Sequence, residues 1–171
     1  AQHLRDARIA AIYEGTNGIQ ANDLVGRKVG RENAETVLAL ISDMRMLDAD
    51  LSDARSTHIS AARKHLMAAI DALEDTSNWI AASWGTTPSA VAAGAVPYLR
   101  LLGLTVGGWL MCRSALIAEC YLRESKGDLE FFNAKLISTR FFADQYLVQC
   151  PALRHTVCDG STAIEALSIA G

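Results

Sequence analysis

Residues 31–54 read RENAETVLALISDMRMLDADLSDA, and their spacing decides the class of fold. Apolar side chains recur at steps of three and four residues, which places them on one face of an α-helix, with acidic residues between them. The apolar positions are Val37, Leu40, Ile41, Met44, Leu47 and Leu51. The stretch therefore predicts one long amphipathic helix from Arg31 to Ala54.

The stretch from Thr57 to Ala82 repeats this pattern. Its apolar stripe consists of Ile59, Leu66, Ile70, Leu73 and Ile80. Asp53 or Ser56 is expected to mark the turn between the two helices. Two long amphipathic helices joined by a short turn predict an antiparallel hairpin.

A third helix is predicted over Ser89 to Glu124, after a loop at residues 84–88. This segment is apolar nearly all round, so we expect it to be the central helix of the fold. Pro97 lacks a backbone N–H donor and is expected to bend or restart the helix. Gly103, Gly107 and Gly108 lower helix propensity, but they permit close contact with another helix.

A fourth helix is predicted from Leu129 to about Val148, with Asp128 as its N-cap. Pro151 is expected to end it, and a short last helix is expected at Ala163–Ile169. No segment has the alternating pattern of a β-strand. The predicted fold is all-α: a helix-loop-helix segment followed by an up-and-down bundle of about four helices.

Composition argues against some classes of function. The net charge of −3 and the lack of a Lys/Arg stripe give no basis for binding nucleic acid. The most apolar run, Leu101 to Cys112, is shorter than the roughly 20 residues of a membrane span, so we expect a core helix and no membrane partner. The sequence begins at Ala1 without a signal-like segment, and we expect it to be a piece of a longer protein.

The cysteine and histidine residues form no recognisable metal pattern. Cys112 and Cys120 are eight residues apart, too far along a helix to form a disulfide. Cys150, His155 and Cys158 match no common zinc spacing. We therefore expect reduced thiols and no metal. His58 and His65 are expected at the surface or its boundary, and the tryptophans Trp79, Trp84 and Trp109 are expected to serve in packing.

The most informative motif for function is residues 12–20, IYEGTNGIQ. Glu14 is a lone carboxylate between an aromatic residue and a glycine. A loop of Gly15, Thr16, Asn17 and Gly18 follows, and a new apolar segment then begins. Such an arrangement can present a base to a substrate and a helix N-terminus to a phosphate.

This motif resembles the Tyr-Glu-Gly-Thr segment near the C-terminal end of the catalytic core of acyl-CoA dehydrogenases. The fuller match is Arg5-Asp6-Ala7-Arg8-Ile9, Ile12-Tyr13-Glu14-Gly15-Thr16 and Ile19-Gln20. The resemblance implies that Glu14 is the catalytic base, which removes the proton α to a thioester carbonyl, and that its backbone N–H helps to bind the carbonyl oxygen. An apolar site would raise the pKa of such a carboxyl group.

The same resemblance implies roles for the neighbouring residues. Gly15 leaves room for the thioester to approach the backbone, and Thr16, Asn17 and Gly18 contact the cofactor, FAD. Gly18 departs from the family's pattern, in which many members carry Gln, so any side-chain contact there is lost. Arg5 and Arg8 are expected to be solvated surface residues.

The resemblance also implies a division of the chain. Residues 1–30 correspond to the end of the catalytic core, and residues 31–171 to an appended helical bundle, as in large bacterial acyl-CoA dehydrogenases that act on long-chain acyl-CoA or on 3-methylmercaptopropionyl-CoA from dimethylsulfoniopropionate. It implies an acyl-CoA substrate, electron-transfer flavoprotein as electron acceptor, a cytoplasmic location and a homodimer. The fragment alone lacks the flavin domains, so we expect it to retain no FAD and to be inactive.

Other functions remain open from the sequence. A nitroalkane-oxidase type of flavoprotein shares the fold, but its base is normally Asp. An alkylation-response type of flavoprotein binds DNA through its C-terminal domain, which the acidic charge balance of this chain disfavours. The chain could instead be a free-standing helical interaction or oligomerisation module.

Overall fold

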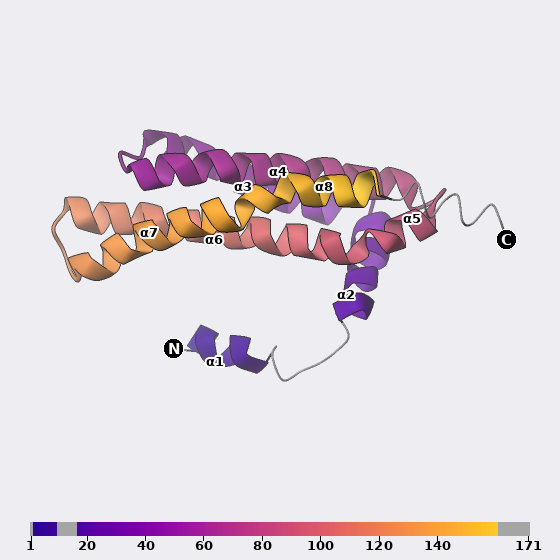
Figure 1. The fold of residues 1–171 in the computed structure, drawn as a ribbon, viewed down its shortest axis with the longest axis horizontal. Helices are drawn as coiled ribbons and strands as arrows, with labels where there is room; N and C mark the ends of the chain where they lie inside the picture. Colours follow the sequence, from indigo (N-terminus) through magenta and orange to yellow (C-terminus); the bar gives the residue numbers. More distant parts are fainter. Residues whose placement is uncertain (1, 10–16, 161–171) are drawn as a thin grey trace.

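The computed structural model describes residues 2–9 and 17–160, and in these residues every regular element is a helix (Figure 1). The all-α prediction is confirmed. The elements are α1 (Gln2–Arg8), α2 (Asn17–Asp23), the π-helix η2 (Leu24–Gly30), α3 (Glu35–Asp53), α4 (Thr57–Ser83), α5 (Pro88–Ala93), α6 (Ala95–Arg123), α7 (Leu129–Gln145), the 3₁₀ turn η3 (Leu147–Gln149) and α8 (Cys150–Cys158).

The predicted hairpin is confirmed as α3 and α4, which pack against each other along the bundle. Ser56 begins α4 as its N-cap, and its side chain accepts a hydrogen bond from the His58 N–H at 3.2 Å. Glu119 of α6 closes the turn from outside, because its Oε1 accepts the N–H groups of Arg55 at 3.0 Å and Ser56 at 2.6 Å. The turn is therefore fixed to a third helix.

We expected α6 to be the central helix, but the most enclosed helix is α4. α4 contacts α3, α6, α7 and α8, and ten of its residues are buried. α6 is apolar all round, but it buries only one face, and Leu110 and Ile117 on the other face are 48% and 59% exposed. Apolar content alone cannot distinguish a helix enclosed on all sides from one whose second face is uncovered in this structure.

The expectation about Pro97 is wrong by three residues, since the break falls at Gly94, between α5 and α6. A Cβ atom at Gly94 would lie 2.7 Å from Cγ1 of Val157, so α8 packs directly on this backbone. Pro97 lies in the first turn of α6, where its missing N–H would have no intrahelical partner.

The prediction that Asp128 caps the fourth helix is confirmed, because its carboxylate accepts the N–H of Phe131 at 3.0 Å. The prediction that Pro151 ends this helix is wrong. α7 ends at Gln145, a 3₁₀ turn follows, and Pro151 lies in the first turn of α8. The predicted helix at Ala163–Ile169 lies outside the described residues.

α6 is the one described helix that is long and apolar enough to cross a membrane, by length and composition alone. The expectation that this apolar segment is too short to cross a membrane is therefore wrong, since α6 has 29 residues. Its contacts with α4, α7 and α8 favour a core helix instead. The absence of a membrane partner stays a prediction.

The N-terminal part approaches the bundle at one end. α2 leads into η2, which contacts α3, α4, α5 and α6, while α1 lies apart from the bundle (Figure 1). α1 has no buried residue, and its Leu4 is 70% exposed. The segment with the sequence motif is thus joined to the bundle through α2 and η2.

Candidate functional site

The predicted site residues divide between described and undescribed parts of the chain. Glu14, Gly15 and Thr16 lie outside the described residues, so their predicted roles stay predictions. Asn17 and Gly18 are the first two residues of α2, and both are exposed. Arg5 and Arg8 lie on the exposed helix α1, as expected for solvated residues.

The surroundings of Gly18 are open. A Cβ atom built on it would meet nothing within 4 Å. Packing among the described residues therefore does not require glycine at this position. The first N–H groups of a helix have no intrahelical acceptor, which suits this end of α2 to a polar ligand.

The inner face of α2 and η2 fixes this helix end to the bundle. Ala21, Val25 and Val29 are at most 1% exposed and belong to the main core. α2 contacts α6, and Ile19 on its outer side is 64% exposed. The first turn of α2 therefore projects from a helix whose other side is buried.

A groove of about 390 Å³ lies beside this junction, and its lining residues come from α2, η2, the segment after η2 and the end of α4. They are Ile19, Asn22, Asp23, Gly26, Arg27, Arg31 and Trp84. Arg27 binds Asp23 through two hydrogen bonds, of 2.7 and 3.0 Å. This pair holds the pKa of Asp23 below its usual value, so both charges are present at neutral pH. The charge of Arg27 is thus offset within the groove.

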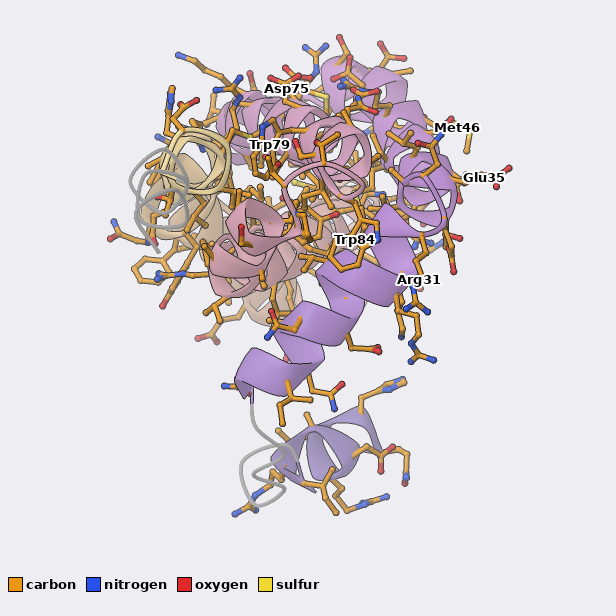
Figure 2. All side chains as sticks on the ribbon, turned by 90° about the vertical axis from the view of Figure 1, so that its right-hand side faces the viewer. Arg31, Glu35, Met46, Asp75, Trp79 and Trp84 are labelled. Carbon is orange, nitrogen blue, oxygen red and sulfur yellow. The ribbon has the colours of Figure 1, made fainter. Side chains whose placement is uncertain are left out.

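Trp84 forms the wall of the groove nearest the bundle, beside Arg31 (Figure 2). A Cβ atom at Gly26 would lie 2.8 Å from Cη2 of its ring, and one at Gly30 would lie 2.5 Å from Cγ. Packing was expected for Trp84 and is confirmed, but its two glycine partners were not predicted. The spacing of the two glycines in the sequence indicates an open helix face, because Gly26 and Gly30 are four residues apart and therefore lie on the same side of the helix.

Cys150, His155 and Cys158 do not converge. Cys150 is buried with its Sγ 4.0 Å from Thr105 Oγ1, whereas His155 is exposed and bonds Asp159 at 2.7 Å. In the described ranges, no group of three His, Cys, Asp or Glu residues is placed to hold a metal ion. Burial raises the pKa of the Cys150 thiol to about 11 and that of Cys112 to about 12, so both stay protonated at neutral pH.

The structure also tests the predictions for His58 and His65 and for the remaining tryptophans. His58 and His65 are partly exposed, and His65 Nε2 lies 3.5 Å from Asp144 Oδ1. Trp79 and Trp109 pack against the core, as expected. Neither set forms a candidate site.

Two kinds of known protein match this chain: a family model and individual relatives. The family model described as "Acetyl-CoA dehydrogenase C-terminal like" matches residues 35–168. The chain is also 37% identical to the 3-methylmercaptopropionyl-CoA dehydrogenase of Ruegeria pomeroyi over 175 aligned positions, which cover 99% of the chain and 28% of that relative.

Two further relatives are more distant. The broad-specificity linear acyl-CoA dehydrogenase FadE5 of Mycobacterium tuberculosis is 31% identical over 91% of the chain and 26% of the relative. A butyryl-CoA dehydrogenase of Syntrophomonas wolfei is 27% identical over 81% of the chain and 23% of the relative. The chain thus spans about a quarter of the length of the curated relatives that it matches.

Proposed function

The chain belongs to the acyl-CoA dehydrogenase family, where it matches the C-terminal portion, and on that premise we propose that its full-length parent removes the α and β hydrogens of an acyl-CoA thioester with Glu14 as the base. The observation that carries the proposal is the position of the motif. Residues 12–20 fall inside the alignment with the Ruegeria enzyme, which covers 99% of the chain.

Glu14 would take the α proton of the thioester. The α C–H is a very weak acid, so its removal needs a positioned carboxylate and a hydrogen-bond donor at the carbonyl oxygen. The backbone N–H of Glu14 would be one such donor, and Gly15 would let the thioester approach the backbone. In this role the chain supplies one edge of the active site.

FAD, when bound in the parent, supplies the acceptor for the hydride that leaves the β carbon. Thr16, Asn17 and Gly18 would contact it at the start of α2. Asn17 and Gly18 are suited to this contact because both are exposed and the space beside Gly18 is open. We expect the 171-residue chain by itself to retain no FAD.

The substrate class of the proposal is a CoA thioester. Among the relatives, the Ruegeria protein is named for 3-methylmercaptopropionyl-CoA and the Mycobacterium protein for linear acyl-CoA. The higher identity to the former puts 3-methylmercaptopropionyl-CoA first in a panel of substrates, with linear long-chain and short-chain acyl-CoAs beside it. Electron-transfer flavoprotein in the cytoplasm is the proposed electron acceptor.

We also propose that the bundle packs on the parent's catalytic core and contributes to a homodimer. Two apolar side chains support this role: Ile117 on α6 and Phe131 on α7 are each more than half exposed and line one hollow between the two helices. Exposed apolar side chains that lie together typically mark a contact with another chain or domain.

The test is expression of the full-length parent with a Glu14→Gln variant and an assay over the acyl-CoA panel. We expect a flavin absorption spectrum in both, and a loss of turnover on the order of 10²-fold or more in the variant, because a positioned base is removed. Glu35→Gln, an exposed Glu in the first turn of α3, is the matched control and should leave turnover unchanged.

The purified 171-residue chain should give no turnover under the same conditions. Turnover by the isolated chain, or a loss below about tenfold in Glu14→Gln, would contradict the proposal. Absence of flavin from the full-length protein would contradict the cofactor assignment.

A further inference from the structure

The junction between α2 and the bundle has an unusual backbone. η2 is π-helical over seven residues, and π-helical segments are rare and often occur at functional sites. Asn33 and Ala34 then follow with φ angles of 49° and 60°, in the left-handed region. Asparagine tolerates this region, but alanine adopts it at a cost of roughly 1–2 kcal/mol. Other contacts must therefore hold the junction in this shape.

One set of these contacts belongs to the core. Ala34 is fully buried, its N–H donates to the carbonyl of Val29 at 2.8 Å, and its own carbonyl accepts the N–H of Leu38 at 2.9 Å. Val25 and Val29 are buried on the same side. These contacts fix the inner face of η2, but Gly26 and Gly30 present a second face.

Trp84 holds this second face. Its backbone is fixed at the end of α4 by a hydrogen bond from its N–H to the carbonyl of Ile80 at 2.9 Å. Its ring lies so close to η2 that no side chain fits at Gly26 or Gly30, as the two Cβ distances above show. η2 thus lies between the core and the Trp84 ring, at the point where α2 joins the bundle (Figure 2).

The packing of Trp84 on η2 affects the site because η2 continues directly into α2. α2 runs into η2 without a break, so any tilt of η2 is passed to Asn17. Asn17 lies nine positions before Gly26, about 13 Å away along the helix, and a tilt of roughly 5° would displace Asn17 by about 1 Å. A misplacement of about 1 Å can cost on the order of 10²-fold in rate.

We infer that Trp84 is a positioning residue of the parent enzyme: by packing on Gly26 and Gly30 it sets the direction of α2, and with it the placement of the residues at the start of that helix. This inference rests on the proposed function, because it assumes that Asn17 and Gly18 contact the cofactor. It gives the appended bundle a part in catalysis beyond packing.

The first test is Trp84→Ala in the full-length parent. We expect kcat to fall on the order of tenfold or more and the flavin to dissociate more readily, while cooperative unfolding is retained. Trp84→Phe keeps an aromatic ring over the glycines and should recover most of the activity. Trp79→Ala removes the same side chain five residues earlier on α4, and it should lower stability without changing kcat.

The second test uses the glycine partner. Gly30→Ala places a methyl group against the Trp84 ring and should lower kcat by itself. Trp84→Leu in the same protein relieves this contact, so the double variant should be less impaired than the two single effects combined. Additive effects of the two substitutions would overturn direct packing as the mechanism.

A third test, amide hydrogen exchange, does not depend on turnover. Amide hydrogen exchange of residues 17–34 in the full-length parent should speed up on the order of tenfold or more in Trp84→Ala, while exchange in α7 stays unchanged. An active wild type with unchanged kcat and exchange in Trp84→Ala overturns this inference alone. A wild type without dehydrogenase activity overturns the proposed function and this inference together.

Discussion

At the scale of single residues, the glycines of α6 show how the same residue type serves different purposes. Gly108 lies against Leu147, which is 1% exposed, and an added Cβ would come within 2.7 Å of both of its methyl groups. Gly103 is exposed, and a Cβ there would meet nothing within 4 Å. Close packing therefore requires glycine at position 108 but not at position 103.

We expect Gly103→Ala and Gly108→Ala to change stability in opposite directions. Alanine gains up to about 1 kcal/mol over glycine inside a helix. At Gly108 an overpacking cost of roughly 1–3 kcal/mol exceeds this gain, because buried Leu147 has little room to move. Urea unfolding of the two variants beside wild type measures the difference, and a shift of the same sign in both would contradict it.

The sequence identified the three glycines as permissive of close helix contact, and this holds for Gly107 and Gly108. Phe142 lies 3.1 Å from the Cβ position of Gly107. It does not hold for Gly103. Helical spacing says which residues share a face of α6, but not which face another helix covers, and that depends on contacts from α7 and η3 far along the chain.

At the scale of elements, the α3–α4 hairpin was predictable because its signals are local: two apolar stripes, a short turn and a capping serine. Its cross-links were not predictable. Arg63 binds Asp48 through two hydrogen bonds of 2.7 and 2.8 Å, and Arg45 binds Asp71 at 2.7 Å and also Glu74. The apolar spacing indicates which side chains face the core, but it does not say which charged side chains pair.

The Asp48–Arg63 pair should make a small contribution to stability that depends on pH. Both side chains are more than a third exposed, so solvent screens the pair and we expect only a weak coupling. The hydrogen bonds from Arg63 lower the pKa of Asp48. The contribution is therefore complete above the unfolded-state pKa of about 3.9 and is lost as the pH falls through the folded-state value.

A double-mutant cycle with Asp48→Asn and Arg63→Gln, measured by urea unfolding, checks this expectation. The coupling should be present at neutral pH and should decrease as the pH falls below the unfolded-state pKa of about 3.9. A coupling that grows as Asp48 is protonated would show that the charge of Asp48 is not its source.

At the scale of the whole molecule, the all-α class and the up-and-down arrangement followed from periodicity, but the relative burial of the helices did not. α6 has the most continuous apolar sequence, yet α4 lies at the centre. The part of the candidate site that the structure describes begins at Asn17, and its junction with the bundle depends on Trp84, which is 54 to 58 residues distant from its glycine partners. The spacing of the two glycines indicates an open helix face, but nothing near them in the sequence identifies Trp84 as the side chain that fills it.

The central claim is that Glu14 is the catalytic base of an acyl-CoA dehydrogenase of which this chain is the C-terminal portion. Single-turnover reduction of the flavin tests it most directly: the oxidised full-length parent is mixed with 3-methylmercaptopropionyl-CoA or a linear acyl-CoA without oxygen or electron acceptor. Wild type should bleach the flavin absorbance in one turnover, and Glu14→Gln should bind the substrate but bleach at least about 10²-fold more slowly. Bleaching by Glu14→Gln at the wild-type rate would contradict the claim.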